Sequence, residues 1–180
     1  MSIKIRKFFF GWDFEKEEAW LNKMSAEGLQ LQAVDLHRYI FEEGLSNEYI
    51  YRIEILNKSP THPKNVKYIR FIEDTGAEKI DSCSNWVYFR KKTGDVGFDK
   101  FLSIDLRITY LIKLLWLFAF SFILLLINSW NSFERHSNLI VIILFPFLSV
   151  LSVYGFIQTY IKKSQLKKEK ELNKGRRNDN

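Results

Sequence analysis

The chain has 180 residues and a formal net charge of +6, which is unevenly distributed along it. Residues 1–107 carry 17 basic and 17 acidic side chains, whereas the tail 162–180 carries eight basic and three acidic ones. Nucleic-acid-binding domains concentrate positive charge on their folded part, so this distribution argues against a nucleic-acid partner. The single cysteine, Cys83, excludes an internal disulfide and is typical of a reducing compartment.

The N-terminal part begins with a strand-like segment, residues 3–10, followed by a helix. Asp13 is the predicted N-cap, acidic residues follow it, and Gly28 ends the helix. Phe14, Leu21 and Met24 recur near one face, which we expect to be buried. Three strands then follow, at residues 29–34, 38–43 and 48–56.

The strand at residues 48–56 alternates apolar residues with Arg52 and Glu54, which predicts a sheet with one buried face. Pro63 suits the first turn of a second helix, which Gly76 ends, and strands are predicted at 77–82 and 86–91. This order predicts an α+β fold, a mainly antiparallel sheet with two helices on one face, broadly a ferredoxin-like sandwich. We find no internal sequence repeat.

Two apolar runs, at about 108–127 and 139–161, dominate the last third of the chain. A helix rises 1.5 Å per residue, so about 20 apolar residues cross a hydrocarbon layer of roughly 30 Å. We therefore predict an α-helical two-span transmembrane hairpin over residues 107–161, with a loop at 128–138. The other parts are an α+β domain at 1–106 and a basic tail at 162–180.

Basic residues flank the hairpin on its two chain-terminal sides, whereas the loop between the spans carries Arg135 alone. Because cytoplasmic flanks of membrane helices collect Lys and Arg, we expect both termini in the cytoplasm and the loop outside. The expected location is the cytoplasmic membrane. In the tail, the lysines predicted to contact anionic lipid are Lys162, Lys163, Lys167 and Lys168. Alternatively, the tail only sets the orientation.

Three segments of the chain, KFFFGWDFEKEEAWLNKMSAEGLQL, EYIYRIEIL and WVYFRKK, resemble the bacterial family called domain of unknown function 2812. The resemblance covers about residues 5–95. It implies a gene often encoded beside a PadR-type transcriptional regulator, and some members carry a C-terminal membrane hairpin. It implies no catalytic or binding residue. Family members tend to have Trp after the glycine that ends the first helix, where this chain has Leu29.

Catalytic and metal-binding motifs are not apparent in the sequence. His37, His62 and His136 fall in separate predicted elements, so neither a metal site nor a histidine-based catalytic set is predicted. The adjacent acids Glu17 and Glu18 should diverge and lie on a solvated surface, as should Glu42 and Glu43. Cys83 has acidic and polar neighbours and is expected to be unreactive. We therefore predict a non-enzymatic protein without a cofactor.

Aromatic residues are the one chemical excess of the N-terminal domain. Such residues normally pack a core, but Trp12, Trp20, Trp86 and Tyr88 are also candidates for an aromatic binding face. The sequence favours a membrane-anchored regulatory or interaction protein whose cytoplasmic domain binds a protein partner or a second copy. The alternative is a sensor of a small apolar or aromatic ligand in an envelope or drug-stress response.

Overall fold

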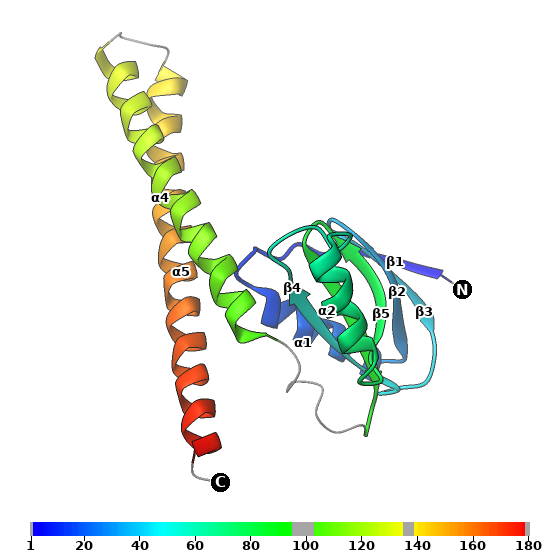
Figure 1. The fold of residues 1–180 in the computed structure, drawn as a ribbon. Coiled ribbons are helices and arrows are strands. Elements are labelled where there is room, and N and C mark those ends of the chain that lie inside the picture. Colours follow the sequence, from blue (N-terminus) through cyan, green and yellow to red (C-terminus); the bar gives the residue numbers. More distant parts are fainter. Residues whose placement is uncertain (1, 95–102, 135–138, 179–180) are drawn as a thin grey trace. The chain divides into compact units, whose positions relative to one another are not determined.

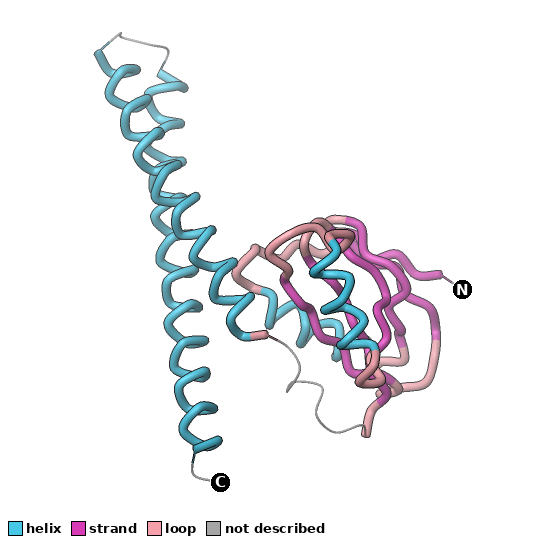
Figure 2. The backbone as a smooth tube through the Cα atoms, in the orientation of Figure 1, coloured by secondary structure: helices cyan, strands magenta, loops and turns pink. Residues whose placement is uncertain are grey.

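The computed structural model of the protein describes residues 2–94, 103–134 and 139–178 (Figure 1). The chain divides into two compact units, Met1–Arg107 and Ile108–Asn180. The first unit contains all the strands of the described residues, and the second is helical (Figure 2). The elements of the first unit are β1 (Ser2–Arg6), α1 (Phe14–Ala26), β2 (Leu29–Asp35), β3 (Arg38–Glu43), β4 (Tyr49–Ile55), α2 (Pro63–Glu73), β5 (Glu78–Cys83) and β6 (Trp86–Lys92).

The strands form two three-stranded antiparallel sheets, with the orders β1-β3-β2 and β4-β6-β5. The predicted α+β class with antiparallel pairing is confirmed. Each sheet is built by a β-α-β-β segment whose last strand lies between the first two. The topology therefore repeats, although no sequence repeat is apparent.

Among the described strands no ladder joins the two sheets, although β2 and β5, one from each sheet, lie side by side. Both strands carry an irregularity in their register, between Leu31 and Ala33 in β2 and between Lys79 and Asp81 in β5. Such bulges interrupt regular pairing. At this boundary the carboxylate of Asp81 accepts a hydrogen bond from the backbone N–H of Val34, at 2.9 Å. A side chain thus replaces part of the missing ladder.

The two helices pack on opposite faces of the sheet β4-β6-β5, so the expectation that both lie on one face is wrong. Successive residues of a strand point to opposite faces. Tyr88 of β6 belongs to the core that contains Leu21 of α1, whereas its neighbours Val87 and Phe89 belong to the core that contains Ile72 of α2. The sheet is consequently buried on both sides.

Because the sheet is buried on both sides, the environment of Glu54 in β4 also differs from the prediction. The alternating pattern predicted that this carboxylate lies on a solvated face, but Glu54 is 0% exposed. Its face of the strand is covered by α2, whose Tyr68 donates its hydroxyl to Glu54 Oε1 at 3.1 Å. The strand therefore buries a charged residue beside its apolar ones.

Strand β1 ends at Arg6, four residues earlier than predicted. Among the described strands its ladder partner is β3, which begins at Arg38, and the register pairs Arg6 with Arg38. Beyond this pair β1 has no strand to continue along. Residues 7–13 therefore form a connection to α1, which presents Phe8 and Phe10 to solvent.

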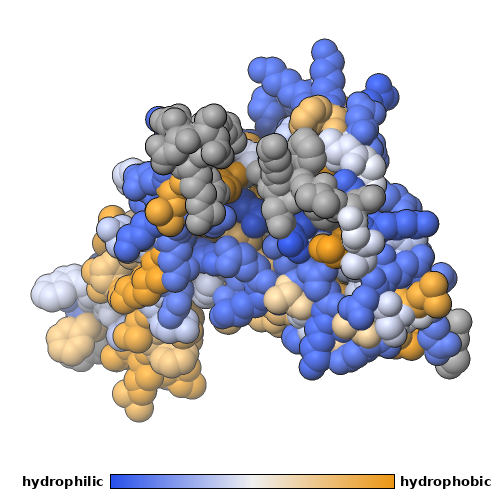
Figure 3. All heavy atoms as spheres, turned by 90° about the horizontal axis from the view of Figure 1, so that it is seen from below, coloured by the Kyte–Doolittle hydropathy of each residue, from blue (hydrophilic) through white to orange (hydrophobic). Residues whose placement is uncertain are grey.

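The second unit contains most of two long helices, α4 (Ile104–Glu134) and α5 (Leu139–Asn178). Both are long and apolar enough to cross a membrane. In the most apolar 18-residue stretch, only 11% of α4 and 17% of α5 is buried. Figure 3 shows hydrophobic side chains gathered over these helices, whereas the first unit is mainly hydrophilic on the face in view. Residues 128–134 of the predicted loop are helical, and residues 135–138 lie outside the described part. The tail is helical to Asn178.

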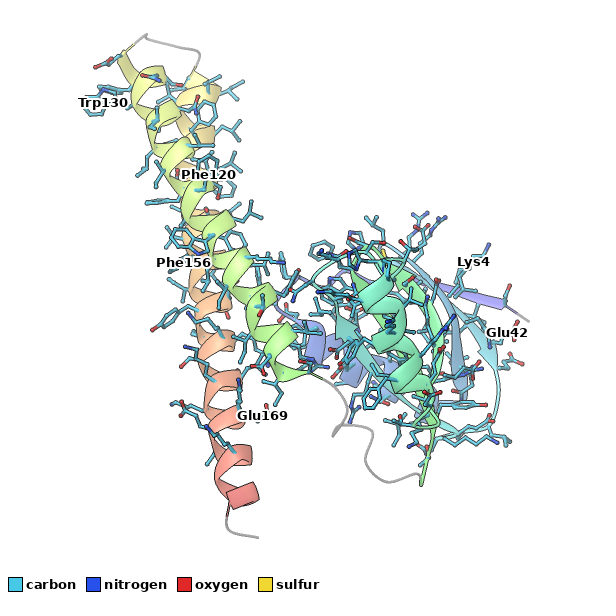
Figure 4. All side chains as sticks on the ribbon, viewed as in Figure 1. Lys4, Glu42, Phe120, Trp130, Phe156 and Glu169 are labelled. Atoms are coloured by element: carbon cyan, nitrogen blue, oxygen red, sulfur yellow. The ribbon has the colours of Figure 1, made fainter. Side chains whose placement is uncertain are left out.

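Small residues, Ser121 on α4 with Ser152 and Gly155 on α5, bring the two helices together. The hydroxyl of Ser152 lies 2.8 Å from that of Ser121 and donates to the carbonyl of Phe118 at 2.9 Å. A Cβ atom on Gly155 would lie 2.6 Å from the Phe118 ring, so only glycine permits this approach. Larger apolar side chains such as Phe120 and Phe156 point away from the helix axes (Figure 4).

Candidate functional site

A pocket of about 210 Å³ opens in the first unit beside the start of α1. Segments far apart in the chain supply its walls: the connection after β1, α1, the β2–β3 turn, β3, the end of β5, the β5–β6 turn and β6. The lining residues are Phe9, Gly11, Glu17, Leu36, His37, Tyr39, Cys83, Ser84, Trp86 and Tyr88. Most of the surface is apolar or aromatic, with a few polar groups, as in sites for small organic ligands.

Glu17 reaches this pocket because of its position on α1. The buried residues of the helix are spaced three and four apart, which is the pattern of a helix with one face inward. Glu17 and Glu18 occupy this face between Phe14 and Leu21. Both acids are buried, so their interpretation as solvated surface is wrong. The sequence pattern that indicates their burial is the spacing of three and four residues from Phe14 and Leu21. The prediction of a solvated surface considered only that the two acids are adjacent.

The carboxylate of Glu17 accepts two short hydrogen bonds at the floor of the pocket. Tyr39 and Tyr88 each donate their hydroxyl to Glu17 Oε1, at 2.7 Å in both cases. Burial, followed by the influence of Glu17, raises the pKa of both tyrosines, so they remain neutral donors. Burial also raises the pKa of Glu17, although the two hydroxyls oppose this shift.

The second carboxylate oxygen of Glu17, Oε2, differs from Oε1 in its hydrogen bonding. Within the described residues, no donor reaches Oε2 and no Lys or Arg forms an ion pair with Glu17. The protein therefore binds one oxygen of a largely buried carboxylate, whereas the other oxygen is not enclosed and is accessible from the pocket.

Glu18 points away from the pocket and binds the end of the first unit. Its Oε1 atom lies 2.6 Å from Nη2 of Arg107, which is in the first turn of α4. The same oxygen accepts the backbone N–H of Ile53 at 2.8 Å. Consecutive residues of α1 thus connect the pocket floor with the segment that leads into the apolar helices. The divergence of the two side chains was predicted, but not their burial.

A second buried acid, Glu54, lies near the same segment. Its Oε1 accepts the hydroxyl of Tyr68 and, at 3.3 Å, the backbone N–H of Ser103. Its Oε2 has no hydrogen-bond partner among the described residues. Burial raises the pKa of Glu54 to about 7, which the charge of Arg107 only partly opposes.

The four aromatic residues proposed as a binding face are not all in one place. Trp86 and Tyr88, both on β6, line the pocket. Trp20 packs against Phe9, Tyr39 and Phe41, with ring centroids 4.8–5.7 Å apart. Trp12 stacks on Phe10 in the connection before α1, at 4.7 Å. The pocket thus combines two of the predicted residues with Phe9 and Tyr39, which come from other elements.

The pocket also contains Cys83 and His37, two residue types that can form a catalytic pair. Within the described residues no hydrogen bond joins them, and the His37 ring instead lies 4.7 Å from the Phe8 ring. His62 caps α2 by accepting the N–H of Lys64, and His136 lies outside the described residues. No group of three potential metal ligands occurs in the described part of the chain.

The predicted lipid-contacting lysines belong to α5 and are not part of this pocket. Lys167 and Lys168 are exposed, whereas Lys162 and Lys163 are half-buried. Their contact with lipid stays a prediction.

The fold and the pocket define a polar α+β domain with a site of ligand-binding character, followed by two helices able to span a membrane. A family model described as "Protein of unknown function (DUF2812)" matches residues 13–123, more than half of the chain. The protein therefore belongs to this family, which confirms the resemblance seen in the sequence. The match continues past the α+β domain into α4. Comparison with curated proteins and with solved structures gave no match.

Proposed function

We propose that this protein is a membrane-anchored, non-enzymatic regulator whose N-terminal domain senses a small apolar or aromatic ligand. The observation that carries the proposal is the pocket, in which aromatic side chains from β3 and β6 surround the largely buried carboxylate of Glu17. Binding pockets commonly combine apolar walls with a few convergent polar groups. An envelope or drug-stress response is the setting we propose for such a sensor.

A route for the signal is available in the neighbouring residue. Ligand contact with Glu17 would act on the first turns of α1, and Glu18 on the same turn holds Arg107. A ligand that shifts α1 would therefore change how the start of α4 is held. This step requires that the ligand bind with different affinities to two arrangements of the Glu18–Arg107 ion pair, as in any ligand-driven shift.

The proposed location is the cytoplasmic membrane, with the N-terminal domain and the tail in the cytoplasm. Support comes from the excess of Lys and Arg on these two sides. A cysteine placed at Asn131, in a Cys83→Ser background, should react with an impermeant thiol reagent added outside whole cells. A cysteine at Lys167 should react only after the cells are opened. The reverse pattern would contradict this orientation.

The ligand-sensing function is tested by closing the pocket. Quinoline, a neutral two-ring aromatic compound, is titrated calorimetrically into the full chain in detergent, with empty micelles as the blank. Cys83→Phe places a ring in the pocket, whereas Cys83→Ser leaves it open. We expect saturable binding to the wild-type protein and to Cys83→Ser, and its loss in Cys83→Phe. Equal binding by both variants would place the ligand elsewhere and contradict the proposal.

A second candidate function, recruitment of a protein partner or a second copy, is favoured by a different surface. Phe8 and Phe10 are 58% and 48% exposed, and Phe10 stacks on Trp12. Exposed aromatic residues often anchor protein interfaces. Phe8→Ser with Phe10→Ser should then reduce the mass of the complex measured by light scattering after gentle extraction. A wild-type protein that is already monomeric and without a partner would count against recruitment.

A further inference from the structure

We infer that the pocket binds a compact organic cation with an aromatic or apolar body, whose positive charge pairs with Glu17. This inference rests on the proposed sensing function and adds the charge and size of the ligand. It depends on the depth of the carboxylate, on its missing partner and on the rings around it.

The carboxylate lies at the floor of the pocket rather than at its rim. Glu17 is 3% exposed, and its two hydrogen-bond donors, Tyr39 and Tyr88, are also buried. Leu36, by contrast, is 68% exposed and forms part of the rim. A ligand that enters past Leu36 therefore meets the Glu17 carboxylate at the bottom.

The protein leaves the charge of Glu17 without a cationic partner. Both tyrosine hydroxyls are directed to Oε1, and Oε2 is left for a donor from outside the described residues. A buried carboxylate is costly unless it is paired and hydrogen-bonded. The contrast with Glu18 is direct, because Arg107 neutralises that neighbouring carboxylate at 2.6 Å. A ligand ammonium or iminium group would supply for Glu17 what Arg107 supplies for Glu18.

The walls of the pocket suit a cation that carries a ring. Aromatic faces attract positive charge through their quadrupole. The ring cluster beside the pocket already holds one cation, since Nζ of Lys7 lies 4.7 Å from the Trp20 ring centroid and 5.3 Å from that of Phe9. Phe9 belongs to both this cluster and the pocket lining.

The charge and the volume together define the ligand class. An anion would be repelled by the carboxylate of Glu17, and the residues that line the pocket include no Lys or Arg to offset it, only His37. A neutral ligand would leave the charge of Glu17 uncompensated and gain only from apolar contact. The volume of about 210 Å³ is smaller than the roughly 300–1,000 Å³ of most ligand pockets, which favours a compact molecule.

The test compares three probes of similar size and different charge: N-methylquinolinium, quinoline, and 2-naphthoate. Each is titrated calorimetrically into the full chain in detergent near neutral pH. The variants are Glu17→Gln, which keeps the acceptor for the tyrosines, and the control Glu27→Gln, which removes one exposed charge from the end of the same helix. We expect N-methylquinolinium to bind at least about tenfold more tightly than quinoline, and Glu17→Gln to remove this advantage. Glu27→Gln should retain it, and 2-naphthoate should bind most weakly.

Each other outcome overturns a defined part of the inference. Equal binding of the cation and quinoline to the wild-type protein would overturn the assignment of charge and leave the sensing function intact. Binding of neither probe would overturn both. If Glu17→Gln binds quinoline as the wild-type protein does, the variant is folded, and retained preference for the cation would then exclude Glu17 as its partner.

Discussion

Glu18 and Arg107, 89 positions apart in the chain, form a buried ion pair with 2.6 Å between Glu18 Oε1 and Arg107 Nη2. Both side chains also bind the backbone of Ile53. Arg107 donates to the carbonyl of Ile53 at 2.8 Å, and Glu18 accepts the N–H of the same residue. Helix α1, strand β4 and the first turn of α4 thus meet at one point. The last residue of the α+β unit is held by the helix that lines the pocket.

Removing Arg107 should destabilise the first unit substantially. Arg107→Met leaves the charge of Glu18 buried and unpaired, which typically costs about 3–5 kcal/mol. Arg38→Met is the matched control, because the Arg38–Asp35 pair is exposed and such pairs contribute at most about 1 kcal/mol. The free energy of unfolding is measured by urea denaturation of the full chain in detergent. Similar losses for the two variants would show that the buried pair is not stabilising.

Ionisation of Glu54 should make the protein less stable as the pH rises. Its folded pKa of about 7 lies above the ordinary value of 4.5, so the folded protein keeps the proton while the unfolded chain loses it. The stabilising contribution is complete below about pH 4.5 and is lost as the pH rises through about 7. Glu54→Gln stays neutral and should avoid this loss. Its stability relative to the wild-type protein should rise by up to about 3 kcal/mol between about pH 5 and pH 8.

The control for Glu54 is Glu42→Gln, which removes an exposed carboxylate near the C-terminal end of β3 (Figure 4). Its stability relative to the wild-type protein should change little with pH. Urea midpoints of the three proteins across the same pH series provide the comparison. A relative stability of Glu54→Gln that does not change with pH would mean that Glu54 is ionised throughout the range.

Binding of N-methylquinolinium should weaken as the pH is lowered, because Glu17 then takes up a proton. Burial raises the pKa of Glu17, so the loss should begin at a higher pH than for an ordinary carboxylate. The probe has a permanent charge, and the pH dependence therefore comes from the protein. The other titratable groups facing Glu17 are Glu18, His37, Tyr39, Cys83 and Tyr88.

Glu17→Gln retains His37 and the other titratable groups, so comparison of the two proteins isolates the contribution of Glu17. Calorimetric titrations of both proteins at each pH give the affinity ratio. The ratio should approach one at low pH. If the wild-type and variant affinities change in parallel, the titrating group is not Glu17.

The contact between the two apolar helices should depend on Gly155. Ser121→Cys with Ser152→Cys, in a Cys83→Ser background, should form a disulfide readily, because the two hydroxyls are 2.8 Å apart. Gly155→Ala places a methyl group 2.6 Å from the Phe118 ring and should slow this reaction by separating the helices. Phe118→Leu should restore part of the rate. Non-reducing gels of membranes treated with an oxidant measure it, and an unchanged rate in Gly155→Ala would contradict the packing.

The sequence predicted best those features that depend on neighbouring residues. Residues such as Pro63 and Gly28 mark helix boundaries through their own backbone preferences, and α2 indeed has Pro63 in its first turn while Gly28 has a φ of +82°. The apolar runs needed only length and composition to indicate helices able to cross a membrane. Period-two alternation located the strands, although it did not reveal that Glu54 is covered by α2.

The amino-acid sequence by itself therefore determined the elements, the α+β class and the apolar hairpin, because propensity and periodicity act over a few residues. Only the tertiary structure decided which side chains meet. Tyr39, Tyr88 and Glu17 converge from β3, β6 and α1, and the two helices cover opposite faces of one sheet. Those contacts join residues up to 71 positions apart. The packing of α1 against β3 and β6, which no local pattern specifies, is what placed Glu17 at the floor of a pocket.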